Sequence, residues 1–229
     1  MNILAIDTTT KKANVGVCYN KITNIKTIDN EITHSEKLLP LINDVLNETN
    51  CNIKNIDTFA CTTGPGSFTG IRIGLATIKA LAKVTNSKIF SINSLELLAN
   101  SAIDSSAKII VPLIDAKNTR AYYGMYENSN GLKQIHELGN KYIKEIIASV
   151  HNYCNINNLN IFNDVLFVLD SENLKELFLT LNELKYIIAS LDMSLLLSLA
   201  ATNNSNSNYI ELDATYVRSS EAERTKYGE

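Results

Sequence analysis

The sequence predicts an α/β protein built from two halves of similar design. Short apolar runs of strand length alternate with segments whose apolar residues recur at helical spacing, which is typical of parallel strands joined by helices. Each half opens with an unbroken apolar run that ends in an aspartate and is followed by a polar hairpin. These aspartates are Asp7 and Asp115. We therefore expect two domains, residues 1–104 and 105–208, with residues 209–229 completing the first.

Length and composition restrict the class of protein. The 229 residues are 45% hydrophobic, enough for one large domain or two small ones, and the formal net charge is -3. A slightly acidic chain is not built to coat nucleic acid electrostatically, although a local basic patch stays open. The four cysteines lack CxxC spacing, which disfavours zinc and favours a reduced, cytoplasmic protein. The longest apolar stretch is too short and too polar to span a bilayer, so we expect no membrane association.

The N-terminal half opens with a predicted antiparallel meander. Its strands are residues 3–6, 13–19 and 22–28. A helix follows, because Thr33 and Glu36 have capping-box spacing and apolar residues then recur at helical intervals. His34 stands at this helix start without a second histidine one turn later, since Leu38 occupies that position. We assign His34 a structural role.

A glycine-rich stretch joins the strand predicted at residues 56–61 to a helix that begins near Thr69. Glycines allow backbone conformations that other residues resist, and Ser67 or Thr69 can cap the helix. Two interpretations stay open: an anion bound at the helix start, or a turn that only lets helix and sheet pack closely. The Walker and dinucleotide patterns do not fit. The positions we assign to a structural turn are Gly64, Pro65, Gly66, Gly70 and Gly74.

The remaining elements continue the alternation of strands and helices. Strands are predicted at residues 88–92, 108–114, 121–126, 165–169 and 186–189, and helices at residues 94–102, 141–150, from 171, and 193–201. Asp7, Thr8 and Thr9 end the first strand, where a carboxylate and hydroxyls could hold a metal–phosphate group. The alternative is that Asp7 caps the turn and binds no ligand.

Four motifs together resemble one family. They are Ile6-Asp7-Thr8-Thr9, His34-Ser35-Glu36-Lys37-Leu38-Leu39-Pro40, Gly64-Pro65-Gly66-Ser67-Phe68-Thr69-Gly70-Ile71-Arg72-Ile73-Gly74 and Asp115-Ala116. The combination is similar to the bacterial TsaB proteins, also called YeaZ, up to about Tyr126 and again from Tyr216 to Glu221. The resemblance implies an actin-like, sugar-kinase-like ATPase fold (ribonuclease H-like) with two related domains around a cleft. It also implies a role in making threonylcarbamoyladenosine at position 37 of tRNAs that read ANN codons.

The resemblance also implies partners. TsaB pairs with the homologous catalytic subunit TsaD, assisted by the ATPase TsaE, and tRNA is reached indirectly through the complex. Two predicted helices have more apolar positions than one sheet-facing side needs. We expect them to pair with the equivalent helices of TsaD, or with a second copy in a homodimer when TsaD is absent. The interface residues would be Leu38, Leu41, Ile42, Val45, Ile71, Arg72, Leu75 and Ile78.

Departures from the catalytic relative argue against an enzyme. That relative holds a metal through two histidines one helical turn apart, and the matching positions here are Ser94 and Leu98. Its second phosphate loop is glycine-rich, whereas the loop after Asp115 has no glycine before Gly124. We therefore expect a non-catalytic subunit with no metal and no cofactor of its own. ATP or ADP would bind only weakly or at the partner interface. The remnant of the nucleotide site would be Asp7, Thr8, Thr9 and Asp115.

Two other functions stay open. An independent ATPase or small-molecule kinase of the same fold would use Asp7 and Asp115 around a magnesium-bound nucleotide. A peptidase would need a paired nucleophile and base, and the sequence shows no such pair.

Overall fold

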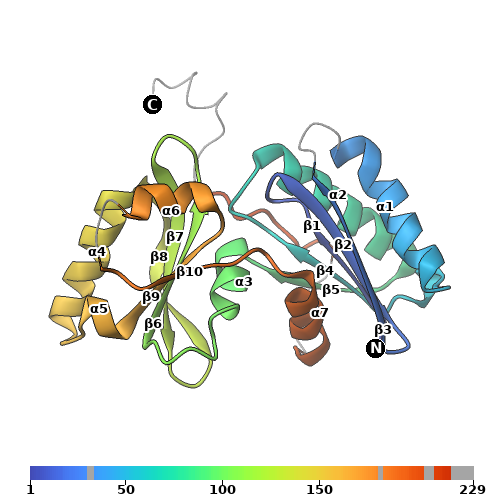
Figure 1. The fold of residues 1–229 in the computed structure, drawn as a ribbon. Coiled ribbons are helices and arrows are strands. Elements are labelled where there is room, and N and C mark those ends of the chain that lie inside the picture. The colour runs from blue at the N-terminus through green and yellow to red at the C-terminus, as the bar shows by residue number, and fades with distance from the viewer. Residues whose placement is uncertain (30–33, 180–182, 204–208, 218–229) are drawn as a thin grey trace. The chain divides into compact units, whose positions relative to one another are not determined.

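The computed structural model describes residues 1–29, 34–179, 183–203 and 209–217, which form two units with one five-stranded mixed sheet each (Figure 1). The first unit comprises Met1–Ser94 and Asp192–Thr215, and the second comprises Leu95–Leu191 with Tyr216 and Val217 at the end of the described chain, so only residues 209–215 of the predicted C-terminal segment join the first unit. This division differs from the predicted boundaries after residues 104 and 208. The last helix belongs to the first unit because it packs on strands of the first sheet.

The first sheet has the strand order β3-β2-β1-β4-β5. The predicted meander is present as β1 (Ile3–Asp7), β2 (Lys12–Tyr19) and β3 (Ile22–Asp29), which pair antiparallel. Two strands added by crossovers, β4 (Thr58–Thr62) and β5 (Lys88–Ile92), continue the sheet in parallel with β1. Every residue of β1 and β4 is buried, because helices cover both faces of the sheet.

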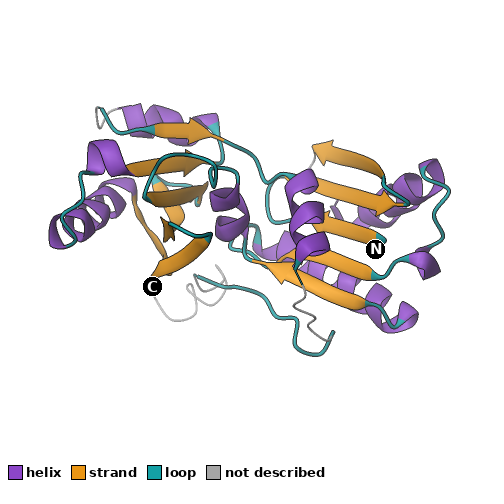
Figure 2. Ribbon diagram, turned by 90° about the horizontal axis from the view of Figure 1, so that it is seen from below, coloured by secondary structure: helices purple, strands orange, loops and turns teal. Residues whose placement is uncertain are grey.

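Helices α1 (His34–Glu48) and α2 (Phe68–Thr85) cover one face of this sheet, and α7 (Met193–Thr202) covers the other (Figure 2). A short 3-10 helix, η2 (Ile53–Asn55), precedes β4. A Cβ atom on Gly16 would approach the side chains of Leu197 and Met193 at 3.2 and 3.7 Å, so α7 lies close to β2. The predicted capping residue Thr33 lies outside the described residues, as do residues 218–221 of the C-terminal motif.

The second sheet repeats the topology of the first. Its order is β10-β9-β6-β7-β8, which is again a meander followed by two parallel strands. The strands are β6 (Ile109–Asp115), β7 (Arg120–Asn128), β8 (Leu132–Tyr142), β9 (Val165–Leu169) and β10 (Tyr186–Ile188), and the helices are α3 (Ser94–Asn100), α4 (Ile143–Ile156), α5 (Ile161–Asp164) and α6 (Glu172–Leu179). The predicted fold class is therefore confirmed, whereas β8 was not predicted, because this edge strand is largely polar.

The apolar residues of α1 and α2 serve the core of their own unit. Seven of the eight residues predicted at a partner interface are at most 7% exposed, and Arg72 alone is exposed. The predicted interface residues other than Arg72 are therefore core residues of this unit, where the two helices use them to cover the sheet and each other. The seven are Leu38, Leu41, Ile42, Val45, Ile71, Leu75 and Ile78.

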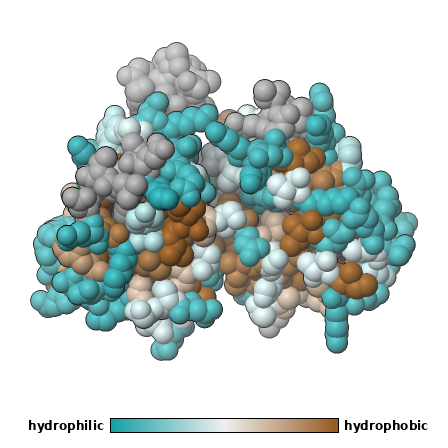
Figure 3. Space-filling model, in the orientation of Figure 1, coloured by the Kyte–Doolittle hydropathy of each residue, from teal (hydrophilic) through white to brown (hydrophobic). Residues whose placement is uncertain are grey.

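Other residues form the outer surface of these helices. Leu39 of α1 and Val84 of α2 are 59% and 85% exposed. Exposed positions recur along α2 at helical spacing, at Thr69, Arg72, Ala76 and Ala80. Figure 3 shows apolar residues in small groups among polar ones over the visible surface of both units. Within the described part of the chain, none of the helices has the length and apolar character to cross a membrane.

The orientation of α1 can be tested by stability. Leu38→Ala should lower the free energy of unfolding by about 2–5 kcal/mol, because it leaves a cavity in the core. Leu39→Ala, at the next position of the same helix, should change it by less than about 0.5 kcal/mol. Urea denaturation followed by circular dichroism measures both variants. Equal losses in the two would contradict the orientation.

Candidate functional site

Asp7 is completely buried at the end of β1, where its carboxylate accepts hydrogen bonds from its own chain. Oδ1 accepts from the Thr9 amide (3.1 Å), the Thr9 hydroxyl (2.7 Å) and the Thr62 hydroxyl (2.5 Å). Oδ2 accepts from the Asn14 side-chain amide (3.2 Å). A buried carboxylate is tolerated only when such donors replace water. The arrangement favours a role for Asp7 in holding the turn.

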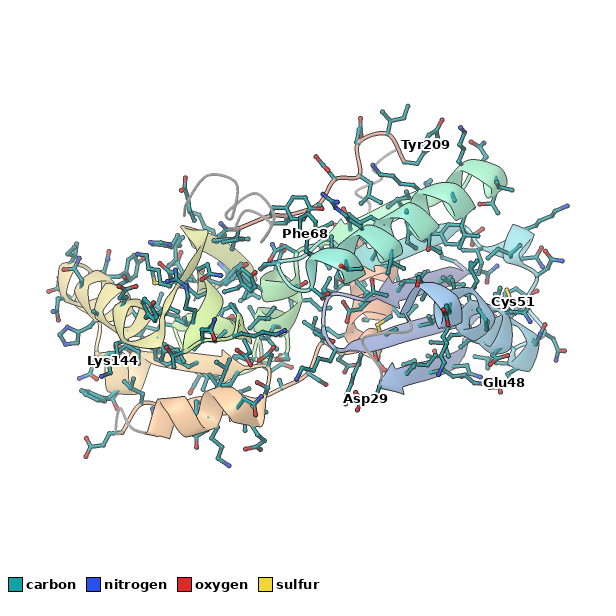
Figure 4. The ribbon with its side chains drawn as sticks, turned by 90° about the horizontal axis from the view of Figure 1, so that it is seen from above. Asp29, Glu48, Cys51, Phe68, Lys144 and Tyr209 are labelled. Atoms are coloured by element: carbon teal, nitrogen blue, oxygen red, sulfur yellow. The ribbon has the colours of Figure 1, made fainter. Side chains whose placement is uncertain are left out.

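The hairpin after Asp7 lies against the first turn of α2. The Ser67 amide donates to the Thr9 carbonyl (2.6 Å), and the Thr8 hydroxyl donates to the Gly70 carbonyl (2.7 Å). Ser67, one of the two capping residues that the sequence left open, is the N-cap, and its hydroxyl accepts from the Gly70 amide (3.2 Å). Groups of the chain itself therefore occupy hydrogen-bonding positions at this helix start. Figure 4 shows Phe68 in this first turn, and its ring lies 3.9 Å from the Arg72 guanidinium.

The glycines of the turn permit this close approach. A Cβ atom on Gly66 would overlap the Thr9 carbonyl, and one on Gly70 would overlap the Thr8 carbonyl. A Cβ atom on Gly74 would overlap the Thr8 hydroxyl. Gly64 has φ +102°, a conformation that residues with a side chain rarely adopt. Of the two open interpretations, the geometry favours close packing of helix and sheet. The first unit thus brings together Asp7, Thr8, Thr9 and all the turn glycines.

Asp115 belongs to the second unit, where its neighbour is a residue that the sequence analysis did not select. Its amide donates to Asp170 Oδ1 (3.2 Å), and its own Oδ1 accepts from the Lys117 amide (2.8 Å). Asp170 follows β9, which lies parallel to β6, so both carboxylates stand at the same edge of the sheet. Burial raises the pKa of Asp170 to about 6, and the nearby Asp115 carboxylate adds to the shift. The sequence signal that could have identified Asp170 was its position just after a predicted strand.

Comparisons with known proteins agree with this architecture. The family model described as "TsaD: tRNA N6-adenosine threonylcarbamoyltransferase" matches residues 26–189. The chain belongs to the TsaD family.

Two curated relatives are named tRNA threonylcarbamoyladenosine biosynthesis protein TsaB. The protein of Haemophilus influenzae is 32% identical over 54% of this chain and 52% of its own length. The protein of Buchnera aphidicola from Schizaphis graminum is 34% identical over 57% of this chain and 62% of its own. These matches confirm the resemblance to TsaB, but they span only about half to three-fifths of each relative's length.

A solved structure shares the fold over nearly the whole chain. It is a Pseudomonas aeruginosa protein described as having similarity to peptidase YeaZ. The two structures superpose with a TM-score of 0.74 at 20% identity, covering 95% of this chain and 99% of the other. At this identity the likeness establishes the fold alone.

The two positions that the resemblance matched to metal-binding histidines, Ser94 and Leu98, are both buried. Ser94 is fully buried, and its hydroxyl donates to the Thr9 hydroxyl (3.2 Å). Leu98 is fully buried in α3. Among the residues that the structure describes, no group of three His, Cys, Asp or Glu side chains is arranged to hold a metal ion.

The perturbed carboxylate gives a pH-dependent prediction. The pKa of Asp170 is about 6 in the folded chain against an ordinary value of 3.8, so the folded state binds the proton more tightly. The wild-type chain should therefore lose stability as the pH rises from about 4 to about 6. Asp170→Asn cannot ionise and keeps an oxygen for the Asp115 amide. Its thermal midpoint should exceed that of the wild type above about pH 6 and equal it near pH 4, in a series of melts. A difference that is constant with pH would contradict the assignment.

Proposed function

We propose that this chain is a non-catalytic partner subunit of a TsaD-containing complex, which transfers a threonylcarbamoyl group to adenosine 37 of ANN-decoding tRNAs. The family supports the pathway, because the chain belongs to the TsaD family and resembles proteins named for threonylcarbamoyladenosine biosynthesis. The proposed complex also includes TsaE and acts in the cytoplasm, where tRNA is used. Without TsaD, the chain would form a homodimer.

The burial of Asp7 is the observation that carries the non-catalytic role. An aspartate that binds a magnesium-bound phosphate must expose carboxylate oxygens toward the ligand. Both oxygens of Asp7 instead accept hydrogen bonds from Thr9, Thr62 and Asn14. We extend the proposal to the nucleotide: ATP or ADP binds weakly, or only at the surface shared with TsaD.

The outer surface of α1 and α2 is the proposed contact with TsaD. This surface consists of the exposed residues of the two helices. Arg72 is the one that the sequence analysis had assigned to the interface, and others are Leu39, Thr69, Ala76, Ala80 and Val84. Small residues such as Ala76 and Ala80 would allow the backbone of a partner helix to approach closely. The core residues of the same helices would contribute indirectly, because they hold α1 and α2 in place on the sheet.

Reconstitution of tRNA modification tests the role. With purified TsaD, TsaE, tRNA and threonylcarbamoyl-adenylate, product should form with this chain and be lost when it is omitted. Asp115→Ala should restore product as well as the wild type, because the proposed role needs no carboxylate there. The chain alone should hydrolyse ATP at background rate. Hydrolysis that Asp115→Ala abolishes would favour the kinase or ATPase instead, and full product without the chain would refute the proposal.

The proposed surface can be tested by co-purification with TsaD. Leu39→Glu and Ala76→Glu should each weaken recovery of the complex at least about tenfold, because a charge would be buried in an apolar contact. Ile156→Glu is the matched control, since Ile156 is 71% exposed but lies on α4 of the second unit. Thermal midpoints should stay close to that of the wild type in all three. Recovery that is equal across the variants would place the contact elsewhere.

A further inference from the structure

The edge of the second sheet holds an arginine in a fixed position. Arg120 at the start of β7 pairs in register with Tyr142 at the end of β8. Its Nε donates to Asn140 Oδ1 (2.8 Å), and its Nη2 donates to the Asn140 carbonyl (2.7 Å). Its guanidinium carbon lies 4.6 Å from the centre of the Tyr142 ring. The guanidinium is therefore held by three contacts before any ligand arrives.

This cation has no counter-ion within the described residues. The ion pairs found there involve Lys26, Lys108 and Lys175, and none includes Arg120. A guanidinium has five N–H donors, so several remain after the bonds to Asn140. Because Nε and Nη2 both donate to Asn140, the plane of the Arg120 guanidinium is fixed. A guanidinium in a fixed plane suits bidentate recognition of an anion.

A second donor beside it also lacks a partner. Asn140 Nδ2 is buried and donates no hydrogen bond to any group of the described chain, while Asn140 Oδ1 accepts one from Arg120. A buried donor without an acceptor is costly, so its persistence calls for an explanation. The donors left for a ligand are the remaining guanidinium N–H groups of Arg120, which favour a ligand with a negative charge and acceptor oxygens.

Tyr142 adds an aromatic surface to this donor cluster. The residue is 46% exposed, and Arg120 lies against its ring. Exposed aromatic rings next to cations are the platforms on which proteins stack the bases of single-stranded nucleic acid. An inorganic anion or a carboxylate would need the donors but would gain little from the ring.

The surrounding charges agree with a phosphate ligand. Lys117 is exposed in the turn before β7, and Lys144 is exposed in the first turn of α4 (Figure 4). The Ile143 amide donates to the Thr119 carbonyl (3.2 Å), which joins these two segments. Two carboxylates near these residues in the chain, Asp115 and Glu145, accept hydrogen bonds from the Lys117 and Tyr142 amides and keep their charge. Arg120, Lys117 and Lys144 thus supply three cations in this part of a chain whose net charge is -3.

We propose that Arg120, Asn140 and Tyr142 form a contact site for single-stranded RNA. The guanidinium binds one phosphodiester, Asn140 holds the guanidinium in position, and the adjoining base stacks on Tyr142. The inference rests on the proposed function and deepens it, because tRNA becomes a direct ligand of this chain. An unpaired segment is required, since a base within a duplex cannot leave its stack to reach the ring without cost.

Binding of a short, fluorescently labelled oligoribonucleotide of mixed sequence to the full chain at low salt tests the site. Arg120→Gln and Tyr142→Ala should each weaken binding by about tenfold, through the lost phosphate contact and the lost stacking. Tyr142→Phe keeps the ring and should bind within about twofold of the wild type. Lys133→Gln is the matched control, because it removes an exposed cation elsewhere on β8 and should also stay within about twofold. Thermal melts of each variant report any loss of folding.

Four results would overturn the proposal. They are no measurable binding, equal binding by all variants, a loss in Lys133→Gln as large as in Arg120→Gln, and displacement of the oligonucleotide by inorganic phosphate or AMP at equal affinity. The last would identify a site for a free anion or a mononucleotide. The assay is independent of reconstitution. If modification proceeds without the chain while RNA binding depends on Arg120 and Tyr142, the proposed function fails and the RNA site stands. If modification needs the chain while RNA binding does not depend on Arg120 and Tyr142, the RNA site fails and the proposed function stands.

Discussion

The buried carboxylate of Asp7 is the constraint on which the first unit depends. A charge without water is tolerated only when donors surround it, and here those donors come from three places in the chain. Thr9 closes the hairpin, Asn14 lies on β2 and Thr62 ends β4. The bonds hold the hairpin where its Thr9 carbonyl meets the Ser67 amide at the start of α2. Glycine is required at Gly66 and Gly70 because the hairpin occupies the space of their side chains.

The two sheets share one topology but differ at their strand ends. In the first unit, Asp7 is fully buried and fully bonded. In the second, Asp115 and Asp170 are partly buried neighbours, and burial shifts the pKa of Asp170 upward. The two units thus repeat one topology while the carboxylates at their strand ends differ in burial and hydrogen bonding. One fold can serve different functions, because function depends on the residues of the site.

Two groups of surface residues are the parts that we propose act on other molecules. The outer residues of α1 and α2 and the Arg120 cluster lie in different units, so each can be altered without disturbing the other's packing. The Arg120 cluster also shows why net charge alone is a poor guide. A chain that is acidic overall still holds a cation whose carboxylate partner is missing from the described residues.

Local chemistry determined much of this protein from the sequence. Apolar runs marked most strands, the glycine motif marked the turn, and Ser67 marked the helix start, because each depends on residues close together in the chain. Tertiary structure alone decided which apolar residues of α1 face inward, since periodicity shows a helix's apolar positions but not how many of its sides are covered. It also decided that α7 returns to the first sheet, that Asp170 joins Asp115, and that the polar edge strand β8 brings Asn140 to Arg120. These contacts join residues far apart in the chain, and only the completed sheets bring them together.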